Sequence, residues 1–161
     1  MRILIVSDTH GYDDNFLKVL EKTGEPDLLI HAGDLCGLEN YMDSYVSCEV
    51  KMVSGNNDFS PRLKREEVFD VDGIGFLVVH GHREHVHYGI DNLVYKGLEY
   101  GVDVVVCGHT HRPFVEFDDE SGIYVVNPGS LTYPRQFNHK PSFILADIDR
   151  QGEIHFTINY L

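Results

Sequence analysis

The first half of the chain alternates short apolar runs with amphipathic segments. Apolar runs at residues 3–7, 27–31 and 50–53 are rich in Ile, Leu and Val, which is typical of buried strands. Between them, residues 13–22 and 38–46 carry apolar side chains at helical spacing. Strands that alternate with helices in this way predict a parallel sheet.

The second half begins with two further apolar runs and a helix. Residues 67–71 and 76–80 predict strands, and residues 104–107 predict another. In the segment 90–98, apolar residues or glycine fall at i, i+3, i+4, i+7 and i+8, which predicts an amphipathic helix.

Two hairpins end the chain. Residues 113–117 and 123–126 flank the turn DDESG, and residues 143–148 and 153–159 flank the turn DRQG. Together with the runs at 67–80, these strands predict a second, mostly antiparallel sheet. We therefore expect two stacked sheets with helices on the outside.

Length, cysteines and charge narrow the class of protein. The 161 residues predict one domain covering residues 1–161. Cys36, Cys48 and Cys107 are odd in number and lack CxxC spacing, so we expect reduced thiols in a cytoplasmic protein without a signal peptide. No apolar run reaches the roughly 20 residues that span a bilayer, so we expect no membrane partner. The formal net charge of −13 weighs against polymeric nucleic acid and leaves small phosphate esters open.

Metal-type side chains follow five of the predicted strands, at the point where each strand ends. In chain order these donors are Asp8, His10, Asp34, Asn56, His80, His109 and His111. Because the carboxyl ends of parallel strands meet at one edge of a sheet, we expect these side chains to converge. Each donor alone is more often a helix cap, a turn former or a surface histidine. Seven together predict a metal site with two ions.

The types of donor and their spacing constrain the ions. Oxygen and imidazole ligands without a thiolate favour Mn, Fe, Zn, Ni or Co over Mg or Ca, and Mn is our first choice. Asp8 and His10 are two residues apart, as are His109 and His111. Side chains alternate along an extended chain, so both members of each pair are expected to point the same way and can reach one ion. Gly33 is expected to let the backbone come close to whatever Asp34 binds.

The order of these motifs resembles the calcineurin-like metallophosphoesterases. The matching pattern is DxH, GD, GN, HG and GHxH, and it extends over nearly the whole chain. VHGHR, GHTHRP and the NPGS of residues 127–130 look most like the small bacterial and archaeal phosphodiesterase branch. The resemblance implies an α/β fold, a four-layer α/β/β/α sandwich of two mixed sheets flanked by helices.

The resemblance also implies how two metal ions are held and used. One ion would be held by Asp8, His10 and His111, the other by Asn56, His80 and His109, and Asp34 would bridge them. Cations about 3.5–4 Å apart lower the pKa of a shared water, and the resulting bridging hydroxide attacks phosphorus in line with the departing oxygen. The implied activity is hydrolysis of a small phosphodiester, with Asp34 and Asn56 as catalytic residues.

One position departs from the wider family. Many of its phosphatases have a histidine after the GN motif, which is thought to protonate the leaving group, whereas this chain has Asn57. An amide cannot act as a general acid near neutral pH, so Asn57 can only hydrogen-bond. His82 is a candidate to orient the substrate or supply that proton, and the alternative is a solvated loop residue. Arg83, Arg112 and Arg135 are either phosphate contacts or ordinary surface charges.

Other functions stay open at this point. A phosphomonoesterase or nucleotide phosphatase of the same fold is one alternative, against which Asn57 weighs. A non-catalytic metal-binding scaffold is another, because a subunit of the retromer complex resembles this branch and works as an interaction platform. Several tyrosines leave a dimeric or tetrameric homo-oligomer open.

Overall fold

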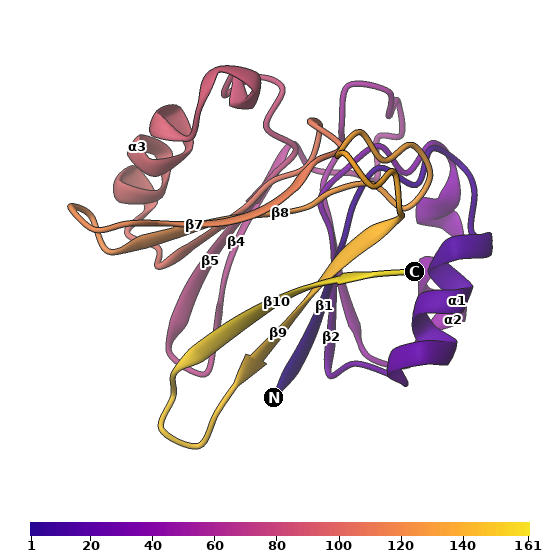
Figure 1. Cartoon of the computed structure of the whole chain (residues 1–161), viewed down its shortest axis with the longest axis horizontal. Helices are drawn as coiled ribbons and strands as arrows, with labels where there is room; N and C mark the ends of the chain where they lie inside the picture. Colours follow the sequence, from indigo (N-terminus) through magenta and orange to yellow (C-terminus); the bar gives the residue numbers. More distant parts are fainter.

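Two five-stranded β-sheets lie face to face, and helices cover their outer sides, in the computed structural model of residues 1–161 (Figure 1). The first sheet has the order β10-β9-β1-β2-β3 and consists of β1 (Arg2–Val6), β2 (Leu28–His31), β3 (Glu49–Met52), β9 (Ser142–Ile148) and β10 (Ile154–Tyr160). The second has the order β4-β5-β6-β8-β7 and consists of β4 (Glu66–Val71), β5 (Ile74–Val79), β6 (Val104–Val106), β7 (Pro113–Asp118) and β8 (Ile123–Pro128).

Three α-helices form the outer layers. The helices α1 (Asp14–Thr23) and α2 (Met42–Tyr45) cover the first sheet, and α3 (Asp91–Tyr100) covers the second (Figure 1). The four-layer α/β/β/α sandwich of two mixed sheets is therefore confirmed. None of these helices combines the length and the hydropathy that a membrane crossing needs.

The C-terminal hairpin belongs to the first sheet, not to the second as predicted. Strand β9 pairs antiparallel with β1, and β10 pairs antiparallel with β9, whereas β1, β2 and β3 are parallel. Ile144, Ala146 and Ile148 of β9 extend the apolar inner face that Ile3 and Ile5 begin on β1. A run of apolar residues shows that a strand has a buried face, but it does not show which strand it pairs with.

The second sheet is not mostly antiparallel either. Strands β5, β6 and β8 are parallel to one another, and only the edge strands β4 and β7 run antiparallel to their neighbours. The middle strand β6 is buried on both faces, as its continuous Val104–Val106 run requires of a central parallel strand. The hairpin β7–β8 forms as predicted, with β8 on its inner side.

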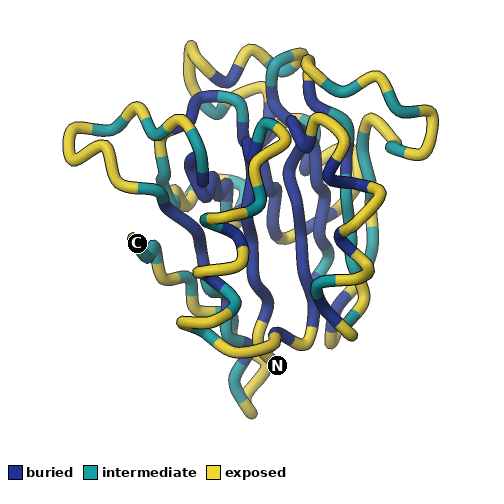
Figure 2. Tube along the Cα trace, turned by 90° about the vertical axis from the view of Figure 1, so that its right-hand side faces the viewer, coloured by how far each residue is buried: buried dark blue, intermediate teal, exposed yellow.

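Alternating side chains divide the interior into three apolar clusters. Figure 2 shows long stretches of the central strands as buried. On β1, Ile3 and Ile5 pack between the two sheets, and Leu4 and Val6 pack under α1 and α2. On β5 of the second sheet, Phe76 and Val78 pack between the two sheets, and Leu77 and Val79 pack under α3. Both faces of each central strand are therefore buried, which fixes the register and holds the strand ends in place.

The predicted helix at residues 38–46 is divided in two. Leu38, Met42 and Val46 are buried, as their helical spacing predicts. The backbone instead forms a 3₁₀ turn at Leu38–Asn40 and the single-turn helix α2, because the chain enters this segment through the left-handed Gly37 at φ 105 and the 3₁₀ turn ends at Tyr41, which precedes α2. Asp13 directly precedes α1, but its carboxylate accepts a hydrogen bond from Tyr45 and does not cap the helix.

Candidate metal centre

The predicted donors lie on loops at one end of the sandwich, the upper end in Figure 1. Because β1, β2 and β3 are parallel, and β5 is parallel to β6, the loops after these strands lie at the carboxyl edges of the two sheets. In chain order these loops supply Asp8 and His10, Asp34, Asn56, His80, and His109 and His111.

Four of these side chains form one tight group. The ligand atoms of Asp8, His10, Asp34 and His111 all lie within 4.8 Å of one another. The His111 Nε2 atom is 3.0 Å from Asp8 Oδ1, and the Nε2 atoms of His10 and His111 are 3.2 Å apart. Asp8, Asp34 and His111 are buried, and His10 is partly exposed. We call this group the buried cluster.

His80 approaches the buried cluster from the second sheet. Its Nε2 atom is 3.5 Å from Asp34 Oδ2 and 4.0 Å from Asp8 Oδ1. The same Asp34 Oδ2 atom is 3.8 Å from His10 Nε2. The Asp34 Oδ2 atom thus lies within 4 Å of one histidine from each sheet.

Hydrogen bonds fix which imidazole nitrogen faces the carboxylates. His80 Nδ1 donates to the Ala32 carbonyl at 2.7 Å, and His111 Nδ1 donates to the Tyr133 carbonyl at 2.7 Å. Each ring therefore directs Nε2 inward, as metal-ligating histidines do.

Two buried polar atoms in this centre have no hydrogen-bond partner. They are Asp8 Oδ1 and His80 Nε2. Native proteins rarely leave such atoms unpaired, since the desolvation cost is about 1–3 kcal/mol each and more for a charged group. A lone pair on Nε2 that faces carboxylate oxygens is repelled unless a cation lies between them. The donor set therefore fits a divalent transition-metal ion.

The ionisation states also suit a metal. Burial alone would raise the pKa of the Asp8 carboxyl, but attraction to the neighbouring His111 and His80 imidazoles outweighs it and lowers that pKa. Burial is likewise outweighed at Asp34, where attraction to His80 and the hydrogen bonds from Asn57 hold the pKa well below its usual range. The carboxylates in turn raise the pKa of His80 despite its burial. A proton and a metal ion thus compete for the same position.

The two histidines of the GHxH motif separate, contrary to the prediction that they point the same way. His111 joins the buried cluster, whereas the His109 ring lies 5.2 Å from the His80 ring and 4.7 Å from the His87 ring. Burial first, and then the charge on His80, lower the pKa of His109 to about 4, so it is a neutral imidazole. The prediction was wrong because it assumed an extended chain, and here φ is positive at both histidines.

Left-handed backbone recurs at five of the seven donors. The φ angle is 54° at Asp8, 48° at His10, 56° at Asp34, 67° at His109 and 58° at His111. For residues other than glycine, this conformation costs roughly 1–2 kcal/mol each. Asp8 and His10 do reach one cluster, as predicted, but through strained turns and not through extended chain. Such strain persists where the surrounding structure enforces it, typically at functional sites.

Two glycines make room for these turns. A Cβ atom on Gly33 would lie 2.6 Å from His80 Nδ1, and one on Gly55 would lie 2.1 Å from Asp34 Oδ1. Gly33 was expected to let the backbone approach the ligand of Asp34. It instead makes space for the His80 ring, and Gly55 makes the space for Asp34.

Asn56 and Asn57 take different positions. Asn56 is exposed and forms no hydrogen bond with the other donors, so its role as a ligand stays a prediction. Asn57 donates its backbone N–H to Asp34 Oδ1 at 2.8 Å and its amide to Asp34 Oδ2 at 2.7 Å. Asn57 therefore orients the central carboxylate, which agrees with the expectation that it can only hydrogen-bond.

Asp58 is a positioning residue that the sequence did not reveal. Its carboxylate accepts backbone N–H groups from Leu35 at 3.2 Å, Cys36 at 2.7 Å and Gly55 at 2.8 Å. It thereby joins the loop after β2 to the loop after β3. An acidic residue three positions after a glycine indicates only a turn, and this contact between loops depends on the packed sheet.

The NPGS segment supports the backbone beneath the donors. The buried Asn127 amide donates to the Gly108 carbonyl at 2.6 Å, and Ser130 Oγ donates to the Asp8 carbonyl at 2.8 Å. His82 lies farther out, with its ring 5.4 Å from the His80 ring.

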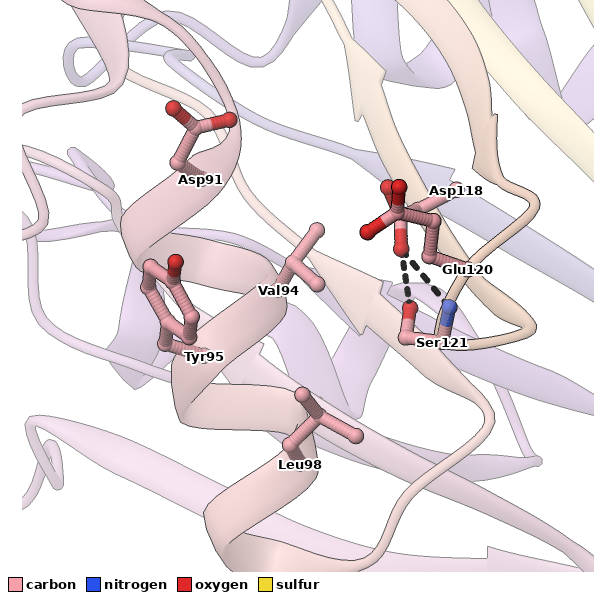
Figure 3. Close-up of a pocket in the computed structure, with 7 residues that line it drawn as sticks. All are labelled: Asp91, Val94, Tyr95, Leu98, Asp118, Glu120 and Ser121. Carbon is pink, nitrogen blue, oxygen red and sulfur yellow. Dashed lines mark hydrogen bonds between the residues drawn. The ribbon is translucent and has the colours of Figure 1, made fainter.

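The largest pocket of the molecule lies away from this centre. It has a volume of about 420 Å³ and separates α3 from the turn between β7 and β8 (Figure 3). Val94, Tyr95 and Leu98 face Ser121 and the carboxylates of that turn. None of the seven predicted donors lines this pocket, so the size of a concavity does not mark the metal centre here.

Comparison with known proteins identifies the family. A profile described as the calcineurin-like phosphoesterase superfamily domain matches residues 1–151. A probable metallophosphoesterase of Mycoplasma pneumoniae is 37% identical over 158 residues, which cover 95% of this chain and 92% of that protein. A phosphodiesterase of Methanocaldococcus jannaschii is 31% identical over 147 residues, covering 80% of this chain and 83% of that protein.

Solved structures agree on the fold. A predicted phosphoesterase of Streptococcus pneumoniae superposes with a TM-score of 0.79 at 22% identity, covering 99% of this chain and 97% of that one. Wild-type Vps29 of Entamoeba histolytica, solved in complex with zinc, superposes with a TM-score of 0.78 at 25% identity. This superposition covers 99% of each chain. With the profile match over nearly its whole length, the chain belongs to the calcineurin-like phosphoesterase superfamily.

Proposed function

We propose that this metallophosphoesterase hydrolyses phosphodiesters and uses two divalent metal ions, with Mn²⁺ as the first choice. The observation that carries the proposal is the pair of unpartnered buried atoms, Asp8 Oδ1 and His80 Nε2, which lie 4.0 Å apart beside the Asp34 carboxylate. A relative named as a phosphodiesterase favours diesters over monoesters.

The ligand assignment is the one that the order of the motifs implies. We assign Asp8, His10 and His111 to one ion, Asn56, His80 and His109 to the other, and Asp34 to both. Two such cations would lower the pKa of a shared water and neutralise charge on the phosphoryl oxygens. The protein supplies ionised carboxylates, a neutral imidazole at His109, fixed imidazole tautomers at His80 and His111, and a buried, strained frame that needs little reorganisation.

Departure of the leaving group depends on Asn57 and His82. The Asn57 amide is committed to Asp34 and has no acidic proton, so the leaving oxygen receives little protonation from this loop. His82 is the nearest remaining imidazole on the His80 side, and burial lowers its pKa, so it is neutral near pH 7. We assign it to orienting the substrate.

The test is a series of diesters that differ only in the leaving alcohol, assayed with the Mn²⁺-loaded protein. We expect rapid hydrolysis of nitrophenyl diesters, much slower hydrolysis of alkyl diesters, and a steep dependence of rate on the pKa of the leaving alcohol. A flat dependence would mean that another group, His82 first, donates a proton. Preference for the matching monoesters, or no turnover with any metal, would overturn the proposed function.

A further inference from the structure

A polar pocket of about 290 Å³ adjoins the metal centre on its His80 side. Besides His80, its walls are Arg65, Glu66, His82, Arg83, Glu84 and Lys96, and no apolar residue lines it. His80 thus belongs both to the metal centre and to the wall of this pocket. The volume equals about ten waters of the liquid, so it holds a small charged group with part of the chain that carries it.

The two carboxylates of the pocket are already paired. Lys96 Nζ lies 2.8 Å from Glu84 Oε1 and 2.5 Å from Glu66 Oε2, and Glu66 also accepts a hydrogen bond from Tyr100. No ion pair joins Arg65 or Arg83 to a carboxylate. Two guanidinium groups without an ion-pair partner therefore lie beside the metal centre, and cationic side chains outnumber carboxylates in the pocket although the formal net charge of the chain is −13.

His82 adds a hydrogen-bond donor to these charges. Its Nε2 atom accepts the Nε–H of Arg83 at 3.4 Å, so the ring proton is on Nδ1. That Nδ1 atom is buried and has no partner. A buried N–H without an acceptor is a costly feature that a bound anion would remove.

We infer that this pocket binds a second anionic group of the substrate, a terminal phosphate on the ester chain that stays attached when the phosphodiester is cleaved. The inference rests on the proposed function, because the scissile phosphate must lie at the metal centre for the chain to reach the pocket. Guanidinium groups bind phosphate oxygens through paired hydrogen bonds. Three separate donor groups match the three terminal oxygens of a phosphate better than the two of a carboxylate.

The test compares 4-nitrophenyl ethyl phosphate with the analogue that carries a phosphate on the ethyl chain, using Mn²⁺-loaded protein. We expect wild type to have a kcat/KM for the phosphorylated diester about tenfold or more above that for the plain one, because hydrogen bonds to charged groups are strong. In the double variant Arg65→Ala, Arg83→Ala this ratio should fall toward one. Arg62→Ala is the matched control, because Arg62 lies in the same loop and bonds Asn40 at 3.1 Å outside the pocket. It should keep the wild-type ratio.

Calorimetric titration with methylenediphosphonate separates this inference from the proposed function. We expect the double variant to bind this probe about tenfold more weakly than wild type and Arg62→Ala do. If no diester is hydrolysed but this difference in binding is found, the proposed function fails and the anion pocket stands. If diesters are hydrolysed but wild type shows no preference and the double variant binds the probe normally, the pocket assignment is overturned. The assignment would also be overturned if Arg62→Ala lost as much substrate preference and probe affinity as the double variant does.

Discussion

The buried cluster has an exposed counterpart elsewhere in the chain. Asp149, Glu153 and His155, at the turn between β9 and β10, also bring their ligand atoms within 4.8 Å of one another. We call this group the turn cluster. Both groups contain carboxylates and imidazole, so distance alone does not distinguish them.

Hydrogen bonding does distinguish them. In the turn cluster, Asp149 accepts backbone N–H groups from Gln151 at 2.9 Å and Glu153 at 3.0 Å, and its other oxygen is 2.9 Å from His155 Nε2. The hydrogen bond with His155 lowers the pKa of Asp149, and the same bond raises the pKa of His155. The turn cluster therefore satisfies itself as an ion pair in solvent.

The buried cluster does not satisfy itself. Asp8 Oδ1 and the neighbouring His80 Nε2 lack partners, and left-handed backbone recurs at Asp8, His10 and Asp34. Unpaired buried atoms on a strained frame require something that is not part of the chain, whereas a paired, exposed turn does not. The following predictions test this contrast, in order of decreasing effect.

The largest effect is expected from Asp34→Asn. This change removes charge from the carboxylate that faces both sides of the centre, while Asn57 can still hydrogen-bond the side chain. We expect roughly a 100-fold or greater loss of activity, because a metal supplies several kcal/mol of transition-state stabilisation. Elemental analysis should show at least one metal equivalent lost from a protein with an unchanged circular dichroism spectrum. Two ions and normal turnover in the variant would contradict the bridging assignment.

A loss of one metal ion is expected from His80→Ala. The His80 ring is buried, and its Nε2 atom faces Asp34, whereas His85 and His87 are exposed. The variants His85→Ala and His87→Ala should therefore keep the metal content of wild type, although His87 packs against His109. If either one lowers metal content as much as His80→Ala does, the loop after β5 has been misassigned.

A smaller effect is expected on stability, from His31 beneath the buried cluster. The ring is fully buried between Thr9 Oγ1 at 3.0 Å and the Gly33 N–H at 3.3 Å, and burial lowers its pKa to about 4 from 6.5. The unfolded chain therefore binds a proton that the folded one does not, so stability falls as pH drops from 6.5 toward 4. The free energy of unfolding should therefore be roughly 3 kcal/mol lower below pH 4 than above pH 6.5 on account of this one histidine.

Urea unfolding of chelated protein at several pH values measures this effect. In the variant His31→Gln, the free energy of unfolding should change less between pH 6.5 and 4 than in wild type. Its pH dependence outside this range should stay close to that of wild type. A variant with the same loss of stability as wild type between pH 6.5 and 4 would show that His31 is not the group that titrates.

The smallest effect is expected from the turn cluster. Asp149→Asn and His155→Gln remove an exposed ion pair, and exposed pairs contribute little to stability. We expect metal content, diester turnover and the midpoint of unfolding to stay close to wild type in both variants. If either variant lost a metal equivalent, the exposed and internally paired turn cluster would be a metal site. The distinction drawn between the turn cluster and the buried cluster would then be wrong.

The sequence predicted the elements of this fold better than their pairing. Apolar runs located the strands, because a buried strand needs a continuous or alternating apolar face. They could not assign the hairpin β9–β10 to the first sheet, since that depends on which edge strand is free once β1, β2 and β3 are packed. The segment 38–46 has a helical pattern of apolar side chains but a backbone that Gly37 and Tyr41 interrupt.

The site could be predicted because its donors follow strands in a fixed order of motifs. The structure brings Asp8, His10, Asp34 and His111 together, with His80 beside them. What the sequence could not supply is the local conformation. Left-handed turns separate His109 from His111, and the loop-to-loop contact of Asp58 exists only after the sheet has formed.

The central claim is that two metal ions share the Asp34 carboxylate. Electron paramagnetic resonance of chelated protein reloaded with Mn²⁺ tests it most directly, because two ions joined by a bridging ligand are exchange-coupled. We predict that the coupled signal grows to a plateau at two equivalents of Mn²⁺ per chain in wild type and is absent from Asp34→Asn. Saturation at one equivalent, with the six-line spectrum of an isolated ion, would contradict the account.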